Sequence, residues 1–372
     1  MTIPDTEALL DGINRWAAIE SKTDDRDGIA RMMAVAEADF RAAGLVTETI
    51  PGRDGFGDHL AARAPWGGDS EGILVLCHLD TVHPAGTLAA NPLRTEGDRA
   101  YGPGIYDMKG GVWIALSAIR SLADAGEQTP LPIRFLVVSD EEVGSPTSQS
   151  RIVAAAEQAK YVLVTEPARD GGCCVTGRKG AARMKIVARG KPAHSGVSHS
   201  DGESAVLEMA RQIVDLEAMT DYETGVTVNV GLLSGGTGVN VVPEICTAEL
   251  DIRMTRPEDG AAAVAKVQGI RPYNPAVELT ISGGMNRPPY RKSNAIASLY
   301  EHARGLASEI GFELGETFTG GGSDGNFTAP VAPTLDGLGV DGAGAHTLEE
   351  HLYVSSLVPR MMLLRRLFQT LN

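Results

Sequence analysis

Cysteine is scarce in this chain of 372 residues. The four cysteines, Cys77, Cys173, Cys174 and Cys246, show neither CxxC spacing nor the dense arrangement of a disulfide framework. A small secreted fold that is stabilised by disulfides is therefore excluded, and a reduced, cytoplasmic setting is expected.

Basic charge and long apolar runs are lacking as well. The chain has 33 Lys and Arg against 48 Asp and Glu, a formal net charge of −15, and such an acidic surface repels phosphate backbones. No window approaches the ~18 uninterrupted apolar residues of a membrane span, and the acidic start "MTIPDTEALL" does not read as a secretion signal. We therefore expect neither nucleic acid nor a membrane as a partner.

The remaining composition is that of a globular protein, with 43% hydrophobic and 22% charged residues. A chain of this length favours two domains. The first ~50 residues are predicted to be helical. Apolar strands then alternate with helices and predict an α/β domain whose largely parallel sheet is covered on both faces. The predicted strands span 73–77, 133–140 and 161–167, and the helices span 110–126 and 151–159.

From residue 176 to 285 the pattern changes. Segments such as "AARMKIVARG" mix polar and apolar residues, as expected of strands with one solvated face. The order of elements is β-α-β-β-α-β, which indicates a self-contained α+β unit. We therefore predict one discontinuous domain, 1–175 and 286–372, interrupted by an inserted domain, 176–285.

Polar side chains follow the predicted strands, where ligands gather in open α/β sheets. They are His78 and Asp80 after the first strand, Asp107 in a glycine-rich turn, Glu141 and Glu142 after the second, Glu166 after the third, and His346 in a late loop. Each alone has an ordinary explanation, such as a helix cap at Asp107. Together, carboxylates gathered at one edge would repel one another, and a divalent cation removes that repulsion.

The types of residue indicate which class of metal would fit, namely borderline cations such as zinc. Two histidines and three carboxylates without cysteine suit two zinc ions in a catalytic site. Of the adjacent Glu141 and Glu142, one can bind metal while the other accepts a proton from water. Asp80, two residues beyond His78 on the same side of an extended chain, is placed to accept the far ring N–H of that histidine.

Six short motifs occur in an order that resembles a known family, the dinuclear zinc aminoacylases and carboxypeptidases of peptidase family M20, and particularly its glutamate carboxypeptidase branch. They are "HLDTV", "GPGIYDMKGG", "SDEEVGS", "TEP", "KPAHSG" and "GAGAHTLEEH". The resemblance covers nearly the whole chain and implies a zinc-peptidase-like α/β domain with an inserted lid and dimerisation domain.

The resemblance implies two zinc ions per subunit, for which Co²⁺ or Mn²⁺ can substitute. Asp107 would bridge them. One ion would also be held by His78 and Glu166, and the other by Glu142 and His346. Glu141 would be the general base and Asp80 would orient His78. The other histidines match no ligand position: His59, His83, His199, His302 and His351.

The resemblance also implies roles for residues outside the metal site. His194 in the lid would stabilise the oxyanion, in family members often from the partner subunit, and the inserted domain would form a homodimer. Asn240 would lie near the substrate. Arg287 in "NRPP" would bind the α-carboxylate of the substrate, and Ser323 in "GGGSDG" would line the same pocket.

The expected function is zinc-dependent hydrolysis of the amide bond to a C-terminal amino acid, with glutamate as one candidate, in a peptide or N-acyl amino acid substrate. The alternative is an N-acyl amino acid deacylase of the acetylornithine or succinyl-diaminopimelate type. A non-catalytic binding protein is the remote alternative, since every expected ligand position is filled.

Overall fold

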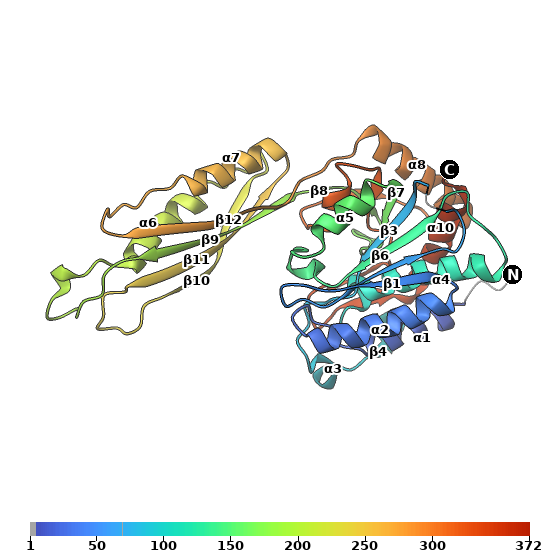
Figure 1. The fold of residues 1–372 in the computed structure, drawn as a ribbon, viewed down its shortest axis with the longest axis horizontal. Coiled ribbons are helices and arrows are strands. Elements are labelled where there is room, and N and C mark those ends of the chain that lie inside the picture. Colours follow the sequence, from blue (N-terminus) through green and yellow to red (C-terminus); the bar gives the residue numbers. More distant parts are fainter. Residues whose placement is uncertain (1–4, 69) are drawn as a thin grey trace. The chain divides into compact units, whose positions relative to one another are not determined.

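The computed structural model describes residues 5–68 and 70–372; the first four residues, part of the segment considered above for a secretion signal, lie outside it. The chain divides into two compact units (Figure 1). The core unit comprises the chain up to Gly177 with Arg291–Thr319 and Ser323–Asn372, and the inserted unit comprises Arg178–Tyr290 with Gly320–Gly322. Both junctions lie a few residues later than the sequence predicted. No helix in the described part of the chain is long and apolar enough to cross a membrane.

The core unit is built on a six-stranded sheet. In spatial order its strands are β1 (Val46–Ile50), β2 (His59–Arg63), β6 (Ile133–Val138), β3 (Gly72–His78), β7 (Ala159–Val164) and β14 (Thr334–Leu335). Strand β3 runs parallel to β6 and β7, and β14 runs parallel to β7, whereas β2 is antiparallel to both β6 and β1. This confirms the α/β class with a largely parallel sheet.

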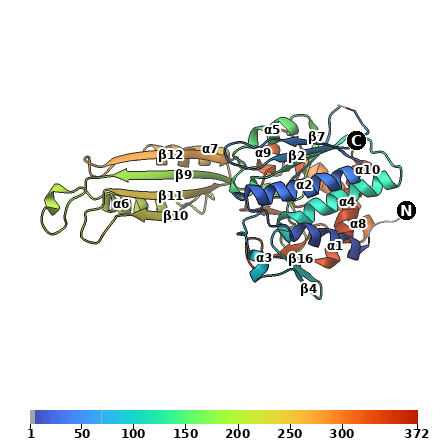
Figure 2. The same ribbon diagram turned by 60° about the horizontal axis from the view of Figure 1, so that its bottom comes forward.

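The helices cover the sheet unequally. One face packs against α1 (Thr6–Ala17), α2 (Arg26–Ala42), α4 (Gly110–Asp124), α8 (Asn294–Ile310) and α10 (Leu357–Thr370), which share one large apolar cluster. On the other face, α5 (Gln149–Ala156) and the single turn α9 (Gly325–Thr328) are the helices of the described residues that pack against the sheet (Figure 2). Strand β3 is buried along its whole length, which explains its continuous apolar run.

The sequence predicted that the first ~50 residues are helical, but the last of them form a strand. Helix α2 begins after Asp25, whose carboxylate accepts the N–H of Gly28. It ends before Gly44, whose φ of 84° suits a residue that lacks Cβ. The chain then forms β1 instead of more helix. Its side chains alternate as a strand requires, with Val46 and Ile50 on one side of the sheet and the two threonines between them on the other side.

Short strands that carry no readable pattern complete the core unit. The strands β15 (Gly342–Ala343), β16 (His351–Tyr353), β5 (Arg99–Tyr101) and β4 (Arg94–Glu96) form a second sheet, and β13 (Glu316–Thr319) pairs with β8 (Cys174–Arg178). The remaining helix, α3 (Thr87–Ala90), is a single turn. Strands of two or three residues are too short to show a periodic pattern, and the pairing of β16 with β5 joins segments about 250 residues apart, so local periodicity does not reveal this sheet.

The inserted unit has the predicted β-α-β-β-α-β order. Its elements are β9 (Gly180–Arg189), α6 (Ala205–Glu217), β10 (Thr227–Gly235), β11 (Ile245–Met254), α7 (Pro257–Gln268) and β12 (Glu278–Arg287). The strands form an antiparallel sheet in the order β10-β11-β9-β12. Burial alternates along β9, because α6 and α7 cover only one face of the sheet.

Two helical glycines test how tightly the core unit is packed. A Cβ at Gly12 in α1 would lie 1.9 Å from the ring of Trp113, which packs edge-on against Trp16. Gly12→Ala is therefore expected to destabilise the protein by about 1–3 kcal/mol through overpacking. Gly305 in α8 has open space around its Cβ position, so Gly305→Ala should stabilise the protein by about 0.5–1 kcal/mol. Urea unfolding measures both, and a Gly12→Ala variant as stable as the parent would contradict this packing.

Candidate metal centre

The carboxyl ends of β3, β6 and β7 meet at one edge of the sheet, because these neighbouring strands are parallel. His78 is the last residue of β3 and pairs in register with Val138 at the end of β6. A single 3₁₀ turn, Glu141–Val143, follows β6 and carries both glutamates. Glu166 follows β7. The three strand ends therefore bring an imidazole and several carboxylates to the same place.

Asp107 lies at the centre of this cluster, in the turn Ile105–Lys109 that leads into α4. Its Oδ1 lies 3.3 Å from Nε2 of His78, and its Oδ2 lies 3.5 Å from Nε2 of His346. Oε1 of Glu166 lies 3.5 Å from Nε2 of His78, and Oε2 of Glu142 lies 3.1 Å from Nε2 of His346. The result is two groups that share Asp107, and within each group the ligand atoms lie within 4.8 Å of one another.

The donors of these two groups fit a divalent cation. Nε2 of His78 and Oε1 of Glu142 are buried without a hydrogen-bond partner among the described residues. Buried polar atoms are rarely left unsatisfied, because each costs about 1–3 kcal/mol. A cation between the imidazoles and carboxylates would satisfy both atoms and offset the repulsion of the acids, and nitrogen and oxygen donors without sulfur suit zinc and similar metals.

The cluster also shifts the protonation of its own members. Hydrogen bonding to Asp107 and to Glu142 raises the pKa of His346 to about 10. Burial raises the pKa of Glu142 to about 8, although the imidazole of His346 opposes this rise. Burial would lower the pKa of His78, but the surrounding carboxylates, led by Asp107, hold it well above its usual value. Without a cation the imidazoles keep protons, which a metal would have to displace.

Asp80 supports the cluster differently from the sequence prediction. Nδ1 of His78 lies 3.0 Å from the backbone carbonyl of Asp80 and 3.5 Å from its carboxylate, so the ring N–H has the carbonyl as its nearer acceptor. The carboxylate instead accepts the backbone N–H groups of Glu141 and Glu142, at 3.2 and 3.1 Å, and the hydroxyl of Thr23 at 2.7 Å. Asp80 therefore anchors the glutamate pair as well as the imidazole.

Glu350 supports Asp107, and the sequence assigned it no role. Its buried carboxylate accepts the backbone N–H groups of Gly104, Tyr106 and Asp107 at 3.0–3.1 Å. Nε2 of His83 lies 2.5 Å from the same carboxylate. In the sequence, this support for Asp107 was visible only as the second glutamate of "TLEEH" and the histidine of "DTVHP", and no local pattern links these two residues to Asp107.

In the inserted unit, the structure brings His194 and Asn240 together. Their loops meet in an isolated β-bridge between His194 and Val241, and the N–H of Ser195 donates to the carbonyl of Asn240 at 3.0 Å. His194 is exposed, and its Nδ1 accepts the N–H of Gly196 at 3.2 Å. A neutral imidazole in this arrangement carries its proton on Nε2, where it can donate to an oxygen atom.

The two remaining predicted substrate contacts differ in their surroundings. Arg287, at the end of β12, is buried against Gly322, where an added Cβ would lie 2.9 Å from the arginine Cδ. Ser323 belongs to the core unit and is also buried; its hydroxyl donates to Asp336 at 2.5 Å and accepts the N–H of Gly325 at 3.0 Å. These bonds use the Ser323 hydroxyl to hold its own loop, so a substrate contact from this residue stays a prediction.

An α/β unit with two imidazole–carboxylate groups at the carboxyl edge of its sheet is typical of metal-dependent hydrolases. The family model described as peptidase family M20/M25/M40 matches residues 74–370, and the chain belongs to this family. It is therefore a hydrolase of a metal-dependent peptidase and amidohydrolase family, as its motifs predicted.

Individual relatives differ in their activities. The chain is 30% identical to carboxypeptidase G2 of Pseudomonas sp. (strain RS-16), over 98% of this chain and 89% of that protein. It is 26% identical to a succinyl-diaminopimelate desuccinylase of Cupriavidus taiwanensis, over 88% of this chain and 90% of that protein. A metallo-carboxypeptidase of Sulfolobus solfataricus described as M20 has the same fold, with a TM-score of 0.77 at 16% identity over 97% of this chain and 98% of that one.

The role of Glu350 can be tested through metal affinity. Glu350→Gln keeps one acceptor oxygen but can no longer serve three N–H groups and His83, so the loop that carries Asp107 should loosen. We expect the affinity for Zn²⁺ to fall about 10–100-fold in chelator competition, the usual effect of losing a residue that supports a ligand. The control is Glu349→Gln, whose side chain is 77% exposed. Equal affinities in the two variants would contradict the supporting role.

Proposed function

We propose that this protein is a dinuclear zinc hydrolase that cleaves the amide bond to a C-terminal amino acid. The observation that carries the proposal is the position of Asp107, whose two carboxylate oxygens lie toward two different imidazoles. A carboxylate shared in this way is what two neighbouring cations require.

The five ligands are proposed to form two sites. His78 and Glu166 would hold one zinc ion, Glu142 and His346 would hold the other, and Asp107 would bridge them; Co²⁺ or Mn²⁺ can replace zinc. When bound, the metals supply Lewis acidity and lower the pKa of water. The positive charge of the metals would then balance the three carboxylates, so the two imidazoles could lose their protons and bind as neutral ligands.

Glu141 is proposed as the general base. Its backbone N–H donates to Oδ1 of Asp80, which fixes the turn that carries it, and it belongs to neither of the two ligand groups. Its carboxylate would take a proton from the attacking water and return that proton to the leaving nitrogen of the amide. The neighbouring Glu142 serves as a ligand, so the acid pair divides its tasks.

Three residues of the inserted unit are proposed to bind the substrate. The Nε2–H of His194 would donate to the oxyanion, and Asn240, held beside it, would contact the substrate. Arg287 would bind the α-carboxylate of the released amino acid, a task that suits a planar guanidinium group.

We also propose that the inserted unit forms a homodimer, in which His194 serves the metal centre of the second copy. Helix α6 exposes Val206, Leu207 and Val214, and the edge strand β10 exposes Leu232 and Leu233. An unpaired strand edge next to exposed apolar side chains is typical of an association surface.

The dimer can be tested by placing a charge in this surface. Leu233→Asp should shift the chain to monomers in sedimentation velocity experiments, because an unpaired carboxylate resists burial. The control is Val331→Asp in the core unit, at a residue that is 46% exposed. A parent chain that is monomeric at all concentrations would contradict the proposal.

Glu141→Gln separates catalysis from metal binding. We expect two zinc ions per chain by elemental analysis and kcat lower by about 10²–10⁴-fold, because only the proton acceptor is lost. Glu142→Gln should instead lose bound zinc. If Glu141→Gln lost metal and Glu142→Gln kept it, the two roles would be exchanged.

The choice of substrate can be tested with a panel of N-acyl amino acids and dipeptides. Released amine is measured with and without a zinc chelator. Chelator-sensitive cleavage at a free C-terminal amino acid supports the carboxypeptidase. Turnover of acetylornithine or succinyl-diaminopimelate without cleavage of dipeptides would favour the deacylase, which the desuccinylase relatives make the second candidate.

Arg287→Lys tests carboxylate recognition while retaining the charge. The loss of the two-pronged donor should raise KM about 10-fold or more for substrates with a free carboxylate, and leave KM for their amides nearly unchanged. Arg291→Lys, an exposed position four residues later, is the control. An equal effect on acids and amides would remove Arg287 from the carboxylate site.

A further inference from the structure

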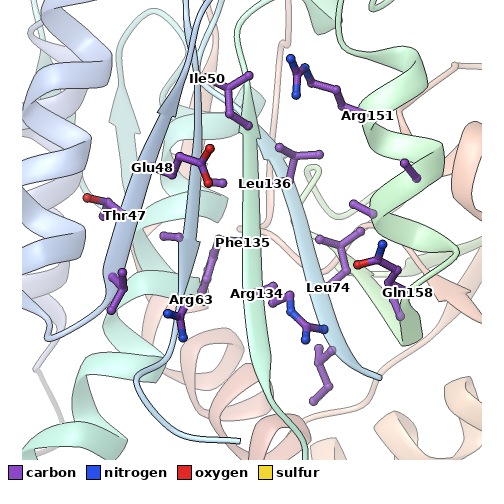
Figure 3. Close-up of a pocket in the computed structure, with 17 residues that line it drawn as sticks. Thr47, Glu48, Ile50, Arg63, Leu74, Arg134, Phe135, Leu136, Arg151 and Gln158 are labelled. Atoms are coloured by element: carbon purple, nitrogen blue, oxygen red, sulfur yellow. The ribbon is translucent and has the colours of Figure 1, made fainter. Parts of the chain in front are cut away.

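The sheet face that α5 and α9 only partly cover contains a groove. Helix α5 packs over β3 and β7 and leaves the surface toward β1 open. The groove encloses a cavity of about 500 Å³ between α5 and strands β1, β2, β6 and β3 (Figure 3). This volume lies within the range of small-molecule sites, about 300–1,000 Å³.

The groove has an apolar floor. Ala61 of β2 pairs in register with Leu136 of β6, and both side chains face the groove; Leu74 of β3 lies one row away. Ile50 of β1 and Ala155 of α5 form its sides. The small side chain of Ala61 leaves the floor hollow next to Leu136. An apolar strip of this kind favours the hydrocarbon part of a ligand.

Two arginines lie directly opposite each other at one end of this strip. Arg63 of β2 and Arg134 of β6 are partners in register and project from the same face of the sheet (Figure 3). Like charges directly opposite each other across strands are destabilising. Arg134 donates to the carbonyl of Ser70 at 2.8 Å, which leaves most of its N–H groups available. This arrangement is unfavourable unless an anion lies between the two guanidinium groups.

The charges around the groove do not neutralise this pair. Arg63, Arg134 and the third lining arginine, Arg151 of α5, have no carboxylate within 4.0 Å among the residues that the structure describes. Glu48 of β1 is the single acid in the lining. Three arginines against one carboxylate is the reverse of the balance in the whole chain, where 48 acidic residues outnumber 33 basic ones.

We propose that this groove binds a small amphipathic carboxylate, with the carboxylate between Arg63 and Arg134 and the apolar body along Ala61 and Leu136. Paired guanidinium groups bind a carboxylate through parallel N–H donors. The site is distinct from the metal centre, because Leu74 and Arg134 lie in the row four residues before His78 and Val138 at the carboxyl ends of β3 and β6.

Calorimetric titration of the full-length, zinc-loaded protein tests the proposal. The probe is octanoate, and octanamide and octylamine serve as its neutral and cationic analogues. Octanoate should bind with one-to-one stoichiometry and more weakly as salt increases, and both analogues should bind at least tenfold more weakly.

Three variants locate the binding. The double variant Arg63→Gln/Arg134→Gln should lower octanoate affinity at least tenfold, and Ala61→Leu, which fills the hollow floor, should do the same while keeping both charges. Arg26→Ala, at an exposed arginine outside the groove, should bind like the parent. Thermal unfolding checks the fold, and the double variant should be at least as stable as the ligand-free parent because a repulsion is removed.

Several results would overturn the proposal. No binding, or equal binding of octanoate and octanamide, would exclude a carboxylate site. Binding that is lost in Glu142→Gln but retained in both groove variants would place octanoate at the metal centre. A change of oligomeric state in the double variant by sedimentation velocity would make the groove an interface between copies of the chain.

Discussion

The structure depends on the concentration of negative charge at one edge of a buried sheet. Asp107, Glu142 and Glu166 converge there with little access to water, where repulsion between carboxylates is strong. The two imidazoles offset part of this repulsion, yet Nε2 of His78 and Oε1 of Glu142 have no hydrogen-bond partner within the part of the chain that the structure describes. A site that holds divalent cations accounts for both features, and the family to which the chain belongs is metal-dependent.

The surroundings of the cluster hold it in place by binding backbone as well as side chains. Asp80 accepts two N–H groups from the glutamate turn, and Glu350 accepts three from the loop around Asp107. Both acids are buried, and each also contacts a further side chain, Thr23 for Asp80 and His83 for Glu350. The turn that carries Glu142 and the loop that carries Asp107 are therefore held by the protein's own contacts, as a precise coordination geometry requires.

The metal centre does not decide the substrate. A carboxypeptidase and a desuccinylase are both relatives of this chain, and their names describe the cleavage of different bonds. Discrimination must come from residues outside the ligand set, and those proposed for this task are the adjacent His194 and Asn240 in the inserted unit and the buried Arg287. The groove beside Arg63 and Arg134 is a further recognition surface, with a chemistry of its own.

Local patterns in the sequence were enough to predict the class of the fold and the order of elements in the inserted unit, and motifs that resemble a known family pointed to the five residues that the structure brings into two groups sharing Asp107. Each depends on periodicity or on a short motif. The tertiary structure alone decided that Asp80 offers its carbonyl to His78, and that the chain forms strands as short as β14. It also brought Glu350 to Asp107 across 243 residues and set Arg63 against Arg134. The contacts of Glu350 and of the two arginines join distant segments through sheet register and loop packing. The contact between His78 and Asp80 is local, but the Asp80 carboxylate is held by the distant N–H groups of Glu141 and Glu142, which no local pattern records.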